Sequence, residues 1–195
     1  MGTDLIQQFI GNVFFIKKKL LKIIGGEFRI YDDKENLLFF AEQEGLKLKE
    51  IFHIYTDEAK TNEIIGITTP HVIDFAASYE VKDTNTNEVY GAIKREGLKS
   101  IFMDEWTIMD NKGQVIGKLK EKSALGAFLS RWINIIPQHY VIKTPDDKLV
   151  AAIDQKFNPL ILQYTMTIQD PNPALDKRLL LGMLVLLTAI EGRQK

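Results

Sequence analysis

A short pattern of apolar and polar positions recurs six times along the chain. Each copy has an aromatic residue, any residue, an aliphatic residue and any residue, and most copies end on Asp or Thr. The six copies begin at Phe28, Phe52, Tyr79, Trp106, Tyr140 and Tyr164. Because successive side chains of a strand point to opposite faces, the aromatic and the aliphatic residue share one face. The pattern therefore predicts six strands that each bury one face.

Turn-forming residues follow most of these copies, and a second strand-like run follows each turn. The copies begin 24 to 34 residues apart, an interval that suits one hairpin and its connections. Asp, Asn, Gly and Pro favour such turns because they tolerate or hydrogen-bond the turn backbone. We expect returning strands over 37–45, 64–69, 89–97, 115–122 and 149–156, an opening strand over 12–19 and a last strand over 162–169. About twelve short strands predict an antiparallel sandwich or barrel.

The C-terminal segment distinguishes between these two architectures. Residues 179–190 are almost entirely apolar without strand-like alternation, and Pro173 and Gly192 suit the start and the end of a helix over about 173–191. A helix that is apolar on every face must be buried, and this run is shorter than the roughly 20 residues of a bilayer span. The favoured prediction is a mainly β protein, a closed antiparallel barrel of about twelve strands in six hairpins around this helix. A membrane span or re-entrant segment is the alternative.

Length and composition indicate one globular domain. The 195 residues fit a single barrel over 12–192, preceded by an extension, residues 1–11, that could be helical. A net charge of -1 provides no overall attraction to nucleic acid, and we expect none to bind. The absence of cysteine excludes disulfides and thiolate metal sites. The N-terminal lysines follow the apolar stretch instead of preceding it, unlike a secretory signal, so we expect a cytoplasmic monomer that could be peripheral to a membrane.

Residues with catalytic or metal-binding chemistry do not form a known constellation. His53, His71 and His139 are far apart in the sequence and lack metal-ligand spacing. Residues 83–87 imitate the opening of a calcium loop, but Glu88 and Lys94 occupy the positions that need Gly and Glu. No nucleophile elbow, phosphate-binding loop or dinucleotide fingerprint occurs. We therefore expect no enzyme, no cofactor and no metal.

Twelve strands, repeated hairpins such as those beginning at 28–32 and 106–110, and an apolar terminal helix together resemble the tubby-like superfamily. This superfamily includes tubby C-terminal domains, phospholipid scramblases and LURP-one-related proteins. The resemblance covers about residues 12–192 and is strongest to LURP-one-related proteins and their small microbial relatives. It implies a non-enzymatic barrel that binds lipid headgroups or an anionic membrane surface, as tubby domains do. Scramblase-like lipid transport is an alternative, although the cysteine cluster and acidic segment of scramblases have no counterpart in this sequence.

Three clusters of basic residues are the candidates for a site that binds anions or lipid. They are represented by Lys118, Lys120 and Lys122, by Lys17 and Lys19, and by Lys94 and Arg95. If the barrel brings these clusters together, they could hold phosphates or an anionic surface. The alternative interpretation is that the lysines solvate the outside of strands and protect strand edges.

Residues 123–136 have the spacing of a short amphipathic helix. We expect this helix to cap one mouth of the barrel. Alternatively, Phe128 and Trp132 contact a membrane or a protein partner. The sequence thus favours a lipid-binding module, with a soluble protein-interaction scaffold as the second hypothesis and an unrecognised enzyme as the third.

Overall fold

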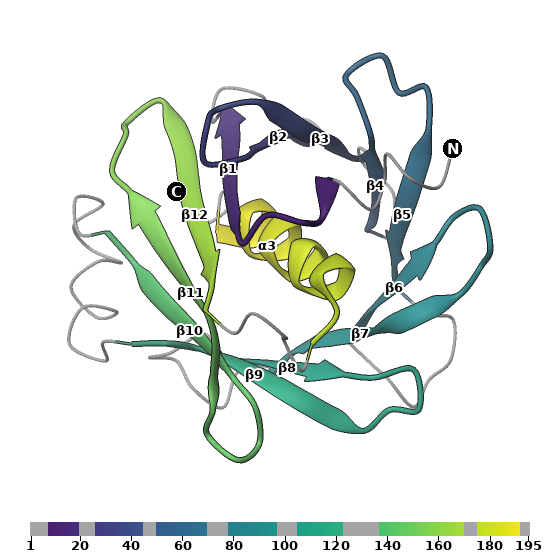
Figure 1. The fold of residues 1–195 in the computed structure, drawn as a ribbon, viewed down its shortest axis with the longest axis vertical. Helices are drawn as coiled ribbons and strands as arrows, with labels where there is room; N and C mark the ends of the chain where they lie inside the picture. The colour runs from purple at the N-terminus through teal and green to yellow at the C-terminus, as the bar shows by residue number, and fades with distance from the viewer. Residues whose placement is uncertain are drawn as a thin grey trace.

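The computed structural model describes residues 8–19, 26–44, 50–69, 78–96, 105–122, 137–169 and 175–191. Within these ranges, twelve strands enclose one C-terminal helix (Figure 1). The strands are β1 (Val13–Lys19), β2 (Gly26–Tyr31), β3 (Leu37–Gln43), β4 (Ile51–Tyr55), β5 (Glu63–Thr68), β6 (Ser78–Asp83), β7 (Val89–Arg95), β8 (Glu105–Met109), β9 (Val115–Glu121), β10 (His139–Lys143), β11 (Leu149–Lys156) and β12 (Ile161–Ile168). The strands whose bounds were predicted lie within two residues of the expected positions.

The barrel is closed and antiparallel throughout. Each strand pairs with its neighbours in the chain, and β1 closes the barrel by pairing with β12. In this closing pair, Phe14 faces Met166 and Ile16 faces Tyr164. Because closure pairs the first strand with the last, the sheet has no open edge. The predicted fold class is confirmed.

The repeated pattern supplies the inner surface of the barrel. The aliphatic residues of all six copies are buried, and so are the aromatic residues of five copies. The exception is Tyr79, which is half-buried and donates its hydroxyl to Glu50 at 2.5 Å. Tyrosine suits such a position because its ring packs on apolar side chains while its hydroxyl reaches a polar partner.

A β-bulge follows the aliphatic residue of the pattern in five hairpins, at Ile30, Ile54, Val81, Ile108 and Ile142. At each bulge, one residue of the first strand faces two residues of the returning strand. The extra residues are Leu38, Ile64, Tyr90, Ile116 and Val150. They belong to the core or pack against it. A bulge re-aims a side chain, so two successive residues of the returning strand can contribute to the interior.

The hairpin turns begin with the polar residue that ends the repeated pattern. Asp32 Oδ1 accepts the backbone N–H groups of Lys34 and Asn36 at 2.9 and 2.8 Å. Asp110 forms the equivalent bonds in its own hairpin. One residue of each of the five turns has positive φ, and these residues are Glu35, Lys60, Asn87, Gly113 and Asp147. Asp side chains therefore hydrogen-bond the turn backbone as predicted, and a residue with left-handed backbone angles closes each turn.

The helix α3 (Lys177–Glu191) runs through the middle of the barrel, as Figure 1 shows. Every residue from Leu179 to Ile190 is buried, including Leu180, Met183, Val185 and Leu187 on different sides of the helix. The helix begins at Lys177 and not at residue 173, and Asp176 Oδ1 accepts the backbone N–H of Arg178 at 2.8 Å. Asp176 thus caps the first turn. The predicted enclosure of the helix is confirmed.

The last residues of the N-terminal extension pack at one mouth of the barrel. The ring of Phe9 lies 4.8 Å from that of Phe39 and 6.5 Å from that of Phe14, measured between centroids. Phe9 is half-buried, whereas Ile10 is exposed. The earlier part of the extension, residues 1–7, lies outside the described ranges.

Candidate functional site

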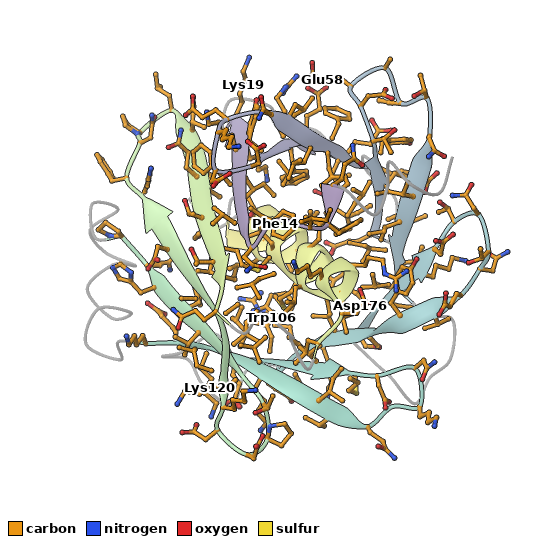
Figure 2. The ribbon with its side chains drawn as sticks, viewed as in Figure 1. Phe14, Lys19, Glu58, Trp106, Lys120 and Asp176 are labelled. Atoms are coloured by element: carbon orange, nitrogen blue, oxygen red, sulfur yellow. The ribbon has the colours of Figure 1, made fainter. Side chains whose placement is uncertain are left out.

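The three predicted basic clusters do not form one site. Lys17 and Lys19 lie on the outer side of β1, whereas Lys118 and Lys120 lie on the outer side of β9. The strand order separates β1 from β9 by β12, β11 and β10. Figure 2 shows Lys19 and Lys120 on opposite sides of the barrel, both directed away from the helix. Each cluster therefore has to be judged by its own surroundings.

The β9 cluster is mixed in charge. Lys118 and Lys120 both approach Glu105, at 3.4 and 3.3 Å. Lys94 lies near them because Thr107 pairs with Lys94 on one side and Lys118 on the other. Lys94 is 3.5 Å from a carboxylate oxygen of Glu96. Neighbouring carboxylates thus offset most of the positive charge on this side of the barrel.

Arg95 lies apart from the lysines just described. Arg95 pairs with Trp106, and its guanidinium carbon is 5.7 Å from the centre of the Trp106 ring. Because Trp106 points into the barrel, Arg95 lies at the inner side of the end of β7, while the adjacent Lys94 lies outside. Lys122 is exposed immediately after β9. Because successive side chains of a strand alternate, Lys94 and Arg95 lie on opposite faces of β7.

The outer side of β11, β12, β1 and β2 carries a different basic cluster, here called the β1 face. Its residues are Lys17, Lys19, Arg29 and Lys156, together with the rings of Phe15 and Tyr31. In register, Gln163 of β12 pairs with both Lys156 and Lys17, and Lys17 pairs with Arg29. Three cations therefore lie along one row that crosses four strands.

Aromatic rings hold two of these lysines in place. The ammonium nitrogen of Lys17 is 4.7 Å from the ring centre of Phe15 and 4.8 Å from that of Tyr31. Lys156 Nζ is 5.3 Å from the same Phe15 ring. Cation–π contacts of this kind position an ammonium group without neutralising its charge. The charge of both lysines therefore remains available to an anion.

A cavity of about 290 Å³ lies in the β1 face. Its lining residues are Lys17, Lys19, Arg29, Tyr31, Glu58 and Ile161. Glu58 forms an ion pair with Arg29. Among the residues that the structure describes, neither Lys17 nor Lys19 has a carboxylate partner, and the same holds for Lys156. The cavity thus combines excess positive charge with an aromatic wall.

Lys18 lies between these two lysines in the chain but has a structural role. Its side chain points into the barrel and is buried. Its ammonium group donates to the carbonyl of Ala189 at 3.3 Å and lies 5.3 Å from the ring centre of Phe28. A cation near the last carbonyls of a helix offsets the negative end of the helix dipole. Lys18 therefore stabilises the C-terminal end of α3.

A second cavity, of about 420 Å³, lies at the mouth where α3 begins. Phe9, Ile10, Ile64 and Ile65 provide its apolar wall. Lys177 contributes an ammonium group that donates within 2.9 to 3.0 Å to four oxygens of residues 9–12. Burial lowers the pKa of this lysine. These hydrogen bonds fasten the N-terminal segment to the start of the helix.

The remaining polar groups of this second cavity are also paired. Arg178 binds the carboxylate of Asp176, with Nε at 2.9 Å, and its guanidinium carbon lies 3.9 Å from the ring centre of Tyr90. The Tyr90 hydroxyl donates to Asp83 at 2.6 Å, and burial followed by this bond raises the pKa of Tyr90. The carboxylates of Asp83 and Asp176 balance the positive charges of Lys177 and Arg178. The described groups thus provide this cavity with no excess charge for an ionic ligand.

Comparison with known protein families agrees with the architecture. A family model described as LURP-one-related matches residues 12–188, which is most of the chain. The chain belongs to the LURP-one-related family. This is a family of tubby-like, scramblase-like barrels, as the sequence resemblance predicted. No curated protein sequence is significantly similar to the chain.

Family membership specifies the fold of this LURP-one-related protein more closely than its activity. The family is generally not described as enzymatic. Within the described ranges, no group of three or more His, Cys, Asp or Glu side chains has an arrangement that could hold a metal ion. None of the described helices combines the length and the apolar character needed to cross a bilayer.

Two of the predicted contact residues cannot be placed in this LURP-one-related barrel. Phe128 and Trp132 belong to residues 123–136, which lie outside the described residues, as does His71. The predicted capping helix, and with it the protein-partner hypothesis, stays a prediction. Sequence reasoning also missed Arg29 and Lys156. Strand alternation could have placed both on the outer surface, but only the order of strands around the barrel places them beside Lys17.

One titratable cluster lies on the outer side of β3, β4 and β5. His53 Nδ1 is 2.8 Å from Glu63 and Nε2 is 2.9 Å from Glu44. The ring of Tyr55 stacks 6.2 Å from that of His53, and its hydroxyl donates to Glu42 at 3.2 Å. Burial and the nearby carboxylates raise the pKa of Tyr55 to about 12. His53 thus joins two strands through two acidic partners.

Protonation of His53 should stabilise the barrel. Burial lowers the pKa of His53, but hydrogen bonds to Glu63 and Glu44 outweigh it and raise the pKa above its usual 6.5. The stabilisation is then complete below the unfolded pKa and lost as the pH rises through the folded pKa. We expect His53→Gln to reduce the free energy of unfolding more at about pH 5.5 than at about pH 8.5, measured by urea denaturation. Equal losses of unfolding free energy at both pH values would contradict this prediction. When Glu63→Gln is also present, the loss caused by His53→Gln should differ less between the two pH values.

Proposed function

We propose that this LURP-one-related protein is a non-enzymatic, cytoplasmic module that binds anionic phospholipid headgroups peripherally through the β1 face. The observation that carries this proposal is the group formed by Lys17, Lys19 and Lys156. These lysines have no carboxylate partner among the described residues. Lipid phosphates and carboxylates would supply the missing negative charge.

The balance of charge supports the β1 face over the β9 cluster. The whole chain has a net charge of -1, so attraction to an anionic surface has to come from a local excess of cations. On the β9 side, Glu105 and Glu96 already lie beside the lysines. On the β1 face, Glu58 pairs with Arg29 and leaves the lysines unneutralised. Fewer ion pairs within the protein therefore have to be broken when an anionic bilayer binds the β1 face.

The aromatic residues of the β1 face add a second reason. The ammonium group of Lys17 lies over the rings of Phe15 and Tyr31, and Tyr31 also lines the cavity. A lysine fixed over a ring loses less side-chain entropy when a phosphate binds it. The cavity of about 290 Å³ provides space for one headgroup phosphate between Lys17 and Lys19.

A pair of charge-reversal variants tests the proposal. Lys17→Glu/Lys19→Glu should weaken binding to phosphatidylcholine vesicles that contain phosphatidylserine by at least about tenfold, because each basic residue near such a surface contributes about 1 kcal/mol. Co-sedimentation at low and high salt measures this effect, and the thermal unfolding of each variant checks that the barrel is folded. Binding of the unsubstituted chain should require phosphatidylserine and should decrease with salt.

The matched control carries the same change of charge on the opposite side of the barrel. Lys118→Glu/Lys120→Glu should retain most of the binding. If this control abolishes binding and the β1 variant does not, the β9 cluster is the site and the β1 face is not. If the unsubstituted chain binds neither type of vesicle, the proposed function is wrong.

A further inference from the structure

The turn between β11 and β12 exposes two large apolar side chains next to the β1 face. Phe157 is 52% exposed and Leu160 is 62% exposed. Three other large apolar residues of the described ranges are also exposed, and these are Ile10, Leu37 and Val115. They lie singly on other elements, and isolated exposed apolar residues are ordinary. Two such residues within one four-residue turn are a stronger indication of a contact surface.

The turn holds these side chains in a defined position. Asn158 Oδ1 accepts the backbone N–H groups of Leu160 and Ile161 at 2.9 and 3.1 Å. Pro159 restricts the backbone between Asn158 and Leu160. The hydrogen bonds satisfy the turn locally, so no protein segment has to cover it. Figure 1 shows this turn beyond the arrowhead of β11, at the upper left of the barrel.

Two cations lie near the base of the turn. Lys156 immediately precedes Phe157, and Ile161 pairs in register with Lys19. A protruding apolar pair next to unneutralised lysines is the composition of a membrane-interface anchor, because the rings and methyl groups enter the acyl boundary while the cations stay at the phosphates. This charge complementarity favours an anionic bilayer over a protein as the occupant.

We propose that Phe157 and Leu160 insert between the lipids of an anionic bilayer that the β1 face attracts. The inference rests on the proposed function and extends it by assigning an insertion element and an orientation. The barrel meets the bilayer with the end that carries Lys19 and the β11–β12 turn. This is also the end at which Lys18 binds the last turn of α3.

A tryptophan introduced into the turn reports insertion directly. In the full chain carrying Phe157→Trp, vesicles of phosphatidylserine and phosphatidylcholine with brominated acyl chains should quench the new emission and shift it to shorter wavelength. The unsubstituted chain provides the background of Trp106 and Trp132. The matched control is Val115→Trp, which places the reporter at a position that is 43% exposed at the start of β9. The vesicles should neither quench nor shift the emission of the tryptophan at position 115.

A second variant tests the energetic contribution without changing charge. Phe157→Ser/Leu160→Ser should weaken binding to the same vesicles about tenfold, since apolar burial is lost while the lysines remain. Vesicle binding without quenching at position 157 would overturn the insertion and leave the proposed function intact. Equal quenching at position 115 would also overturn it. If no vesicle binding occurs, both proposals are wrong. If the unsubstituted chain self-associates without lipid and Phe157→Ser/Leu160→Ser prevents it, the turn is a protein interface and the proposed insertion is wrong.

Discussion

Gly91→Ala is expected to lower the free energy of unfolding by at least about 3 kcal/mol, through overpacking and backbone strain together. A Cβ at this position would lie 2.2 Å from the carbonyl oxygen of Met109 and 3.0 Å from a methyl group of Leu179. The residue also has a φ of 154°, which side-chain-bearing residues rarely adopt. It directly follows the bulge residue Tyr90, where β7 must approach β8 closely. The backbone of a closed barrel cannot move away without breaking its ladder.

The matched control for this prediction is Gly66→Ala. At Gly66, an added Cβ would be 3.3 Å from a methyl group of Thr84 on the outer side of the sheet, and no backbone atom obstructs it. We expect a change smaller than about 1 kcal/mol, as for a tolerated substitution. Urea denaturation of both variants provides the comparison. Similar losses of unfolding free energy for Gly91→Ala and Gly66→Ala would show that the close approach of Gly91 to Met109 is not what destabilises the Gly91 variant.

Leu184→Ala should reduce the free energy of unfolding by about 2–5 kcal/mol, because it leaves a cavity in the centre of the barrel. Leu184 is completely buried, and it belongs to one core cluster with residues from all twelve strands. A closed sheet cannot collapse onto a single missing side chain as freely as an open surface can. Such a loss is a large part of the stability of a small domain.

The same substitution at a partly exposed position separates the effect of burial from that of truncating a leucine side chain. Leu37→Ala removes equivalent atoms at a position that is 37% exposed at the start of β3, and it should cost less than about 1 kcal/mol. Chemical denaturation followed by far-ultraviolet circular dichroism measures both variants. If Leu184→Ala cost no more than Leu37→Ala, the helix would not be packed as the barrel core.

The sequence predicted the inner surface better than the outer one. Phe28 and Ile30 could be assigned to one face because alternation is a local property of a strand. The five bulges were not foreseen, since a run such as Leu38-Phe39 gives no sign of which residue is the extra one. Alternation also implies that Lys18 points opposite to Lys17 and Lys19. Its bond to Ala189 depends on where α3 ends inside the barrel.

The candidate site could be predicted only in part. Lys17 and Lys19 were named from the sequence, whereas Lys156 and Arg29 join them because β1 closes between β12 and β2. The pairing of Lys118 and Lys120 with Glu105 likewise depends on the register between β8 and β9. The sequence alone therefore could not show which lysines lie beside carboxylates and which lie beside other cations.

The sequence by itself determined the strands, their buried faces, the turns and the need to enclose an apolar helix. Each of these follows from the spacing of side chains along a few neighbouring residues and from the cost of exposing apolar surface to water. The tertiary structure alone decided which lysines share a surface and which carboxylates offset them. Closure of the barrel sets those distances, because it brings together strands that are remote in the chain.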